Sequence, residues 1–184
     1  MKRVIFSVLM ILFVLPVQAQ SEPASLFSLP GTWQDSFSKE FTYKDFAKHR
    51  ISIVAMVFTH CQAACPIIIS QLKKLAKALP DDAEQRGIVF KMFSFDYERD
   101  NPTSNSAYLK EHKLNSSLWN MYSSDEVTVR KLALVLGVKY KRDEFGDFEH
   151  SNLVTIINAK GEIIIQLNAV TIDIQKALAA INLK

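Results

Sequence analysis

The sequence predicts an α/β domain with a central mixed β-sheet flanked by helices. Two mostly apolar runs, residues 51–58 and 88–95, have the length and the β-branched and aromatic composition of buried strands. Helical segments follow both runs, and two further apolar strands, residues 153–157 and 163–165, form a hairpin near the end of the chain. Alternating strands and helices favour a sheet covered on both faces, and the closing antiparallel hairpin argues against a fully parallel sheet.

The composition fits one globular domain and excludes several other classes of protein. The chain has 184 residues, of which 48% are hydrophobic and 22% are charged, so it can bury a full core and is not intrinsically disordered. Two cysteines are too few for a disulfide scaffold. The formal charge of +3 falls to +1 without Lys2 and Arg3, so we expect no nucleic-acid partner.

The N-terminus has the three parts of a secretory signal peptide. Lys2 and Arg3 precede an apolar stretch, residues 4–17, and small residues around Ala19 form a cleavage site. The apolar stretch is shorter than the roughly 20 residues that a membrane-spanning helix needs. We therefore expect residues 1–19 to be removed, leaving a periplasmic protein without a transmembrane anchor, in a compartment where thiols can be oxidised.

We expect a flexible arm and then one globular domain C-terminal to the signal peptide. Residues 20–30 are mostly polar and contain two prolines, which is typical of a flexible N-terminal arm. Residues 31–184 form the expected globular domain. Its predicted strands are residues 41–43, 51–58, 88–95, 118–122, 153–157 and 163–165. Its predicted helices are residues 67–79 after Pro66, a segment from Asn101-Pro102 through Leu109, residues 126–136 before Gly137, and residues 172–181.

Cys61 and Cys65 follow the first buried strand and are four residues apart. In a helix or a turn, both sulfurs face the same way and are close enough to form a disulfide or to share one metal ion. Pro66 suits the first position of a helix, which places Cys65 at the helix N-terminus. Free N–H groups and the helix dipole favour a thiolate there, so the pattern predicts reactive sulfur.

Three interpretations of the cysteine pair remain open at this point. A structural disulfide would close a loop of only about five residues, which contributes roughly 2 kcal/mol in the chain-entropy model. A redox-active dithiol is compatible with the spacing, although a gap of two residues is more usual. A metal site needs at least one further ligand from elsewhere in the chain.

Four histidines could supply that ligand. His60 adjoins Cys61 and is expected to point to a different face, where it would form a hydrogen bond in the loop. His49 and His112 lie in polar, lysine-rich surroundings that are typical of surface histidines. His150 precedes a predicted strand, in a loop that could fold back over the cysteines. It is the strongest of the four candidates.

Three blocks of the sequence, in the same order, resemble the Sco/SenC family of thioredoxin-like copper-binding proteins. Residues 59–66, THCQAACP, resemble the family's Thr-His-Cys-Pro-x-x-Cys-Pro block. Residues 94–102, SFDYERDNP, resemble its Ser-x-Asp-Pro-Glu-Arg-Asp-Thr-Pro block, and residues 149–151, EHS, resemble its Asp-His-Ser block. The resemblance extends from about Leu29 to the C-terminus and implies a thioredoxin-like fold.

The resemblance also implies a copper site and a role for it. The family's copper ligands fall on Cys61, Cys65 and His150, a donor set that suits Cu(I), can hold Cu(II), and does not exclude zinc. The implied function is an extracytoplasmic accessory protein that delivers copper to a client, such as the CuA site in subunit II of cytochrome c oxidase. A copper donor or a thiol reductant would be a further partner. Asp96 matches the family's acidic residue and lies either near the metal, at a partner surface, or simply where a strand ends.

Two alternative functions use the same residues. A thiol-disulfide oxidoreductase or redox sensor would use Cys61 and Cys65 as its catalytic pair, with metal binding incidental. A general copper buffer would bind the metal without a dedicated client. Whether the protein is an enzyme stays open, with a non-catalytic copper carrier favoured.

Overall fold

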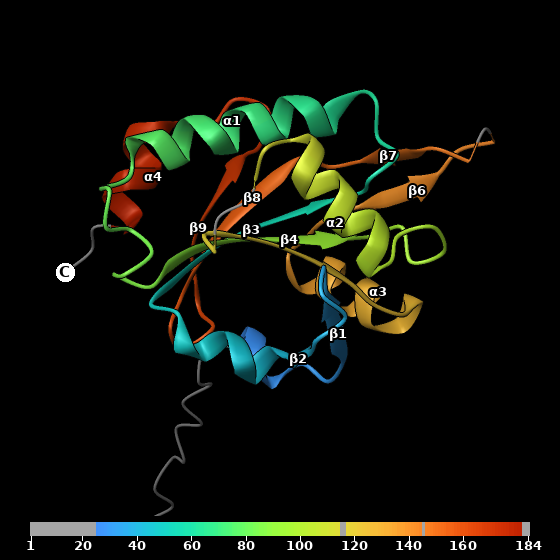
Figure 1. Ribbon diagram of the computed structural model, residues 1–184, viewed down its shortest axis with the longest axis horizontal. Coiled ribbons are helices and arrows are strands. Elements are labelled where there is room, and N and C mark those ends of the chain that lie inside the picture. Colours follow the sequence, from blue (N-terminus) through green and yellow to red (C-terminus); the bar gives the residue numbers. More distant parts are fainter. Residues whose placement is uncertain (1–24, 115–116, 145, 182–184) are drawn as a thin grey trace, which may run out of the picture.

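The computed structural model describes residues 25–114, 117–144 and 146–181 (Figure 1). The expected signal peptide, residues 1–19, lies outside the described residues. Within them, no helix is both long enough and apolar enough to span a membrane.

A seven-stranded mixed sheet forms the centre of the domain. Its strands, in spatial order, are β2 (Glu40–Thr42), β1 (Thr32–Asp35), β5 (Trp119–Ser123), β4 (Ile88–Ser94), β3 (Ile51–Val57), β8 (Leu153–Asn158) and β9 (Ile163–Asn168). Strands β3, β4 and β5 run parallel, whereas β8 is antiparallel to β3 and β9 is antiparallel to β8. The predicted mixed sheet with a closing hairpin is therefore confirmed.

Helices cover both faces of this sheet, as predicted. Helices α1 (Ala64–Ala78) and α4 (Ile174–Ile181) lie side by side on one face, whereas α3 (Glu126–Val135) and the 3₁₀ helix η2 (Tyr43–Lys48) lie on the other (Figure 1). Helix α2 (Pro102–Glu111) packs against β5.

Local sequence signals explain where the helices begin and end. The Asn101 side chain accepts hydrogen bonds from two N–H groups at the start of α2, and Pro102 occupies the first turn. Asp125 caps α3 in the same way, and Gly137, with a φ of +66°, follows its end.

The core explains why β3 and β4 are mostly apolar along their whole length. Every residue of both strands is buried, because helices cover both of their faces. Lys91 is the charged residue within β4. Its ammonium group donates to the Ser52 hydroxyl over 2.7 Å and lies 4.9 Å from the centre of the Phe46 ring.

Several short elements differ from the sequence-based prediction. Strand β1 and the 3₁₀ helix η1 (Leu26–Ser28) had no predicted counterpart, and Tyr43 begins η2 rather than ending a strand. Leu26 is buried in the core and its N–H donates to the Gly161 carbonyl. The residues from Ser25 onward are thus packed on the domain, although the sequence placed them in a flexible arm.

A second, two-stranded sheet positions the candidate site. Strands β6 (Tyr140–Arg142) and β7 (Phe148–His150) pair antiparallel, with Tyr140 opposite His150. This hairpin projects from the end of the main sheet where the chain passes from β3 into α1 (Figure 1). His150 therefore lies at the end of a strand, whereas the sequence predicted a loop.

Candidate metal centre

The turn between β3 and α1 carries both cysteines. Phe58 is buried directly after β3, and the Cys61 N–H donates to the Phe58 carbonyl over 3.4 Å. Helix α1 begins at Ala64, so Cys65 lies in its first turn and its N–H donates to the Cys61 sulfur over 3.2 Å. Both cysteines are free, and 9% of Cys61 and 0% of Cys65 is exposed.

The hydrogen bond between the two thiols shifts their pKa values in opposite directions. The Cys65 thiol donates to the Cys61 sulfur, which lowers the pKa of Cys61 below that of an ordinary thiol. The same hydrogen bond, together with burial, raises the pKa of Cys65. The position of Cys65 at the helix N-terminus was predicted correctly. Its backbone N–H donates a hydrogen bond to the sulfur of Cys61, not to the sulfur of Cys65.

His150 completes a cluster with the two cysteines. Its Nδ1 lies 3.2 Å from the Ser151 carbonyl oxygen, which can only accept, so Nδ1 carries a hydrogen and, in the neutral imidazole, the lone pair is on Nε2. Nε2 is buried and makes no hydrogen bond of normal geometry among the described residues, and the His150 side chain, near the Cys61 sulfur, contributes to the lowered pKa of that thiol. The ligand atoms of Cys61, Cys65 and His150 all lie within 4.8 Å of one another.

Aromatic rings surround the His150 side of this cluster. The His150 ring centre lies 4.9 Å from that of Phe95 and 6.1 Å from that of Phe58. Phe148 packs on both phenylalanines at 5.2 Å. These rings exclude water and fix the imidazole, which leaves its unpartnered nitrogen facing the sulfurs.

The donor set fits a soft metal ion. Two thiol sulfurs and one imidazole nitrogen are ligands for Cu(I), Cu(II) or Zn(II). Two ligands about 2.3 Å from one ion lie at most about 4.6 Å apart, so only a small inward movement separates the present arrangement from coordination. The unpartnered Nε2 of His150 is the group that such an ion would satisfy.

A second group of polar side chains lies beside the first. Ligand atoms of His60, Asp96 and Asp100 also lie within 4.8 Å of one another. Asp96 is buried and bound by two guanidinium groups, those of Arg99 and Arg142. Asp96 thus lies outside the three-residue cluster, and its role is to tie the chain after β4 to β6.

Asp100 is a buried residue beside the cysteine turn that the sequence analysis did not single out. Its buried carboxylate accepts from the Thr59 N–H over 2.9 Å, from the Thr59 hydroxyl and from the Ser94 hydroxyl. It thereby joins the ends of β3 and β4 below the cysteine turn. Thr59 and Asp100 are 41 positions apart in the chain, and no spacing signal connects them.

The other three histidines are not part of the cluster formed by Cys61, Cys65 and His150. His49 and His112 are half-buried and belong to neither cluster of possible metal ligands in the described part of the chain. Burial, aided by nearby lysines, lowers the pKa of His49 to about 4. His60 is 56% exposed and its Nδ1 lies 3.0 Å from the Thr59 hydroxyl oxygen. The expected hydrogen bond of His60 within the loop is therefore present.

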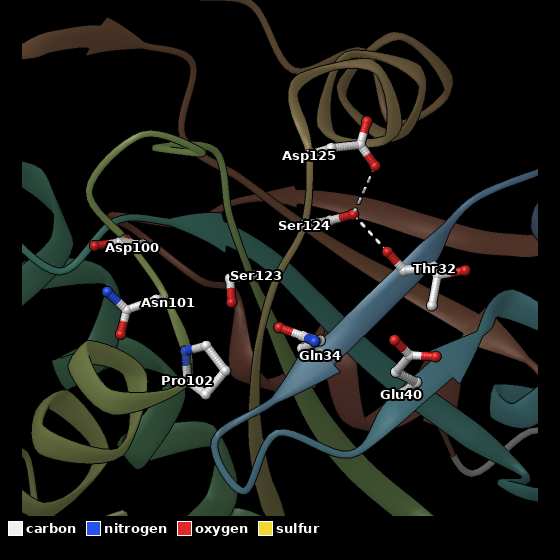
Figure 2. Close-up of a pocket in the computed structure, with 9 residues that line it drawn as sticks. All are labelled: Thr32, Gln34, Glu40, Asp100, Asn101, Pro102, Ser123, Ser124 and Asp125. Atoms are coloured by element: carbon white, nitrogen blue, oxygen red, sulfur yellow. Dashed lines mark hydrogen bonds between the residues drawn. The ribbon is translucent and has the colours of Figure 1, made fainter.

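A polar pocket of about 240 Å³ borders this region on the side of β1. Asp100 and the first residues of α2 form one wall, and the residues between β5 and α3 form another (Figure 2). The Ser124 side chain also lines the pocket. Its hydroxyl donates to the Thr32 carbonyl and lies 3.4 Å from the Asp125 carboxylate (Figure 2). Neither the two cysteines nor His150 lines this pocket.

Comparison with known proteins places the chain in a family. A sequence model described as SCO1/SenC matches residues 20–183. The chain belongs to the SCO1/SenC family. No curated protein sequence matches the chain.

Solved structures of SCO1/SenC proteins share the fold. A SCO1/SenC family lipoprotein from Bacillus anthracis str. Ames is 20% identical with a TM-score of 0.73, and the match covers 86% of this chain and 95% of that one. Arabidopsis thaliana ScoI, solved with copper bound, is 18% identical with a TM-score of 0.69, over 84% and 95% of the two chains. BsSco, described as a Sco family cytochrome c oxidase assembly protein with a disulfide switch, is 20% identical with a TM-score of 0.72, over 89% and 98%. The predicted thioredoxin-like fold is confirmed.

Proposed function

We propose that Cys61, Cys65 and His150 bind one copper ion, which the protein carries as cargo. The observation that carries this proposal is the buried, unpartnered Nε2 of His150, which lies within 4.8 Å of two free sulfurs. A buried polar atom without a partner costs free energy, and a bound ion would remove that cost. Two sulfurs and one nitrogen match the preference of Cu(I) for soft ligands in low coordination number.

The choice of copper over zinc draws on the family. Zinc accepts the same donor types, so ligand chemistry leaves both ions possible. SCO1/SenC relatives such as Arabidopsis thaliana ScoI have been solved with copper bound, which favours copper here. A three-ligand site also leaves room for a fourth ligand during transfer.

We further propose that the cargo passes to a client outside the cytoplasm. An incoming client thiolate would add to the ion, and Cys61, the more exposed of the two cysteines, would leave first. By family, the client is the CuA site of cytochrome c oxidase, an enzyme whose assembly the BsSco relative serves. Cleavage after Ala19 would release the domain into the periplasm.

A thiol-disulfide oxidoreductase is the second candidate function. The lowered pKa of Cys61 and its contact with Cys65 favour it. The two thiols would reduce a client disulfide, giving a Cys61–Cys65 disulfide and two client thiols. Copper binding and this reaction exclude each other, because only the dithiol form binds the ion.

One variant separates the two functions. His150→Ala removes a copper ligand but neither sulfur, so it should abolish tight copper binding and leave dithiol exchange nearly intact. We expect a client to stay without copper when it is supplied only with this variant. A client that His150→Ala still matures fully would contradict the copper-carrier proposal and favour the oxidoreductase. Replacing Cys61 or Cys65 cannot discriminate, since both functions need both sulfurs.

A further inference from the structure

His60 is the exposed neighbour of a nearly closed site. The three proposed ligands are buried or half-buried, whereas His60, next to Cys61 in the same turn, has 56% of its side chain exposed. An imidazole nitrogen is itself a copper ligand. To bind copper, His60 needs a ring nitrogen that carries a lone pair and makes no hydrogen bond within the turn.

The hydrogen bonds below His60 define which nitrogen is free. The Asp100 carboxylate can only accept, so the Thr59 hydroxyl gives its hydrogen to Asp100. The Thr59 oxygen then accepts from His60 Nδ1, 3.0 Å away. In the neutral imidazole, Nδ1 therefore carries the hydrogen and the lone pair is on Nε2.

The network also explains why the second cluster is not a separate metal site. Asp96 is neutralised by the guanidinium groups of Arg99 and Arg142. The Asp100 oxygens accept from Thr59 and from Ser94. The Asp100 carboxylate therefore orients His60 through the Thr59 hydroxyl, in the way that hydrogen-bond acceptors behind a metal-binding histidine orient its ring.

We propose that His60 is a transient copper ligand at the mouth of the site, which passes the ion between solvent or a donor protein and Cys61. Thr59 and Asp100 are positioning residues that hold Nε2 of His60 ready. This inference rests on the proposed copper-carrier function and adds the route by which the cargo enters and leaves. A ligand used only on the route accelerates loading and release equally and leaves the equilibrium affinity unchanged.

The test compares rates with affinity under anaerobic conditions. Reduced protein takes Cu(I) from the coloured Cu(I)–bicinchoninate complex in a stopped-flow instrument, and excess chelator then measures release. We expect His60→Ala to slow both steps by about tenfold, with the affinity unchanged within about threefold. His49→Ala, which removes a histidine at the other end of β3, is the matched control and should load at the wild-type rate.

Two further variants test the positioning residues. Thr59→Val removes the hydroxyl between Asp100 and His60 and should slow loading, whereas Thr59→Ser keeps the hydroxyl and should restore the wild-type rate. Unchanged rates in His60→Ala would overturn the proposal, and so would a loss of affinity as large as that of His150→Ala, which would make His60 a resident ligand. If wild-type protein shows no His150-dependent binding, the copper-carrier function itself fails. That outcome differs from unchanged rates in His60→Ala and from a loss of affinity in His60→Ala.

Discussion

Arg142 and Asp96 connect the strand pair that carries His150 to the chain after β4. The guanidinium Nη2 of Arg142 lies 3.2 Å from Oδ1 of the buried Asp96 carboxylate, and the same guanidinium also binds Glu98. Arg142 lies on β6 opposite Phe148 on β7, two residues before His150. The position of the proposed histidine ligand therefore depends on an ion pair outside the ligand set.

Arg142→Gln tests this dependence. The variant removes the positive charge that holds β6 to Asp96 and leaves all three proposed ligands in place. We expect a loss of Cu(I) affinity of about tenfold, the lower end of the effect of outer-shell residues in metal sites.

Arg130→Gln is the matched control for that variant. It breaks an exposed ion pair with Glu126 within α3 and should leave the Cu(I) affinity unchanged. The two affinities are compared by competition with the same chelator. Equal affinities in the two variants would show that His150 is held without the Asp96–Arg142 pair.

Cys61 should be the sulfur that reacts first with an alkylating reagent. Its pKa lies below that of an ordinary thiol, because the Cys65 thiol donates to it, while Cys65 is fully buried with a raised pKa. We expect iodoacetamide to modify Cys61 selectively near pH 6, as measured by mass spectrometry of proteolytic fragments.

A pair of Cys65 variants isolates the hydrogen bond. Cys65→Ser retains a donor to the Cys61 sulfur and should keep Cys61 reactive near pH 6. Cys65→Ala removes that donor and should shift the reactivity of Cys61 to higher pH. Identical pH profiles in the two variants would mean that the side-chain hydrogen bond does not activate Cys61.

Lys91 should make the stability of the protein rise with pH. Burial lowers the pKa of Lys91 to about 7, from 10.5 in the unfolded chain. Below pH 7 the lysine is charged in both states and the full cost of burying the charge is present. Between about pH 7 and 10.5 the unfolded chain binds more protons than the folded one, so the free energy of unfolding increases with pH by a few kcal/mol.

Lys91→Met isolates this contribution. The variant cannot titrate, so its stability relative to wild type should be most favourable at pH 7 or below and should decline toward pH 10. Lys77→Met, at an exposed position on α1, provides the control for loss of a lysine. Urea unfolding of the three proteins at several pH values measures the slopes. Parallel slopes for wild type and Lys91→Met would contradict a lowered pKa.

The long apolar and amphipathic segments could be predicted from the sequence because their burial depends on their own composition and periodicity. It does not depend on which particular residues they contact. Strands β3 and β4 are buried on both faces, so their composition alone identifies them. Strands β6 and β7 have three residues each and depend on aromatic packing against Phe58 and Phe95, which no local pattern records. Strand β1 was missed because four residues of alternating burial give too short a signal.

The residues of the candidate site likewise could be predicted from the sequence only in part. The spacing of Cys61 and Cys65 marked a reactive pair, but His150 stood out firmly only through the family resemblance. Which cysteine has the lower pKa depends on the direction of one hydrogen bond in the turn, which the spacing of the two residues does not encode. Asp100 and Thr59 escaped notice because their contact is long-range and each residue type is common in loops.

Anaerobic titration of the reduced protein with Cu(I) against a calibrated competing chelator tests the central claim most directly. The wild-type protein, His150→Ala and the control His112→Ala are measured side by side. We predict tight binding of one ion in wild type and in His112→Ala, and a collapse of affinity in His150→Ala. Binding that is weak in all three proteins, or indifferent to His150, would contradict a copper site formed by Cys61, Cys65 and His150.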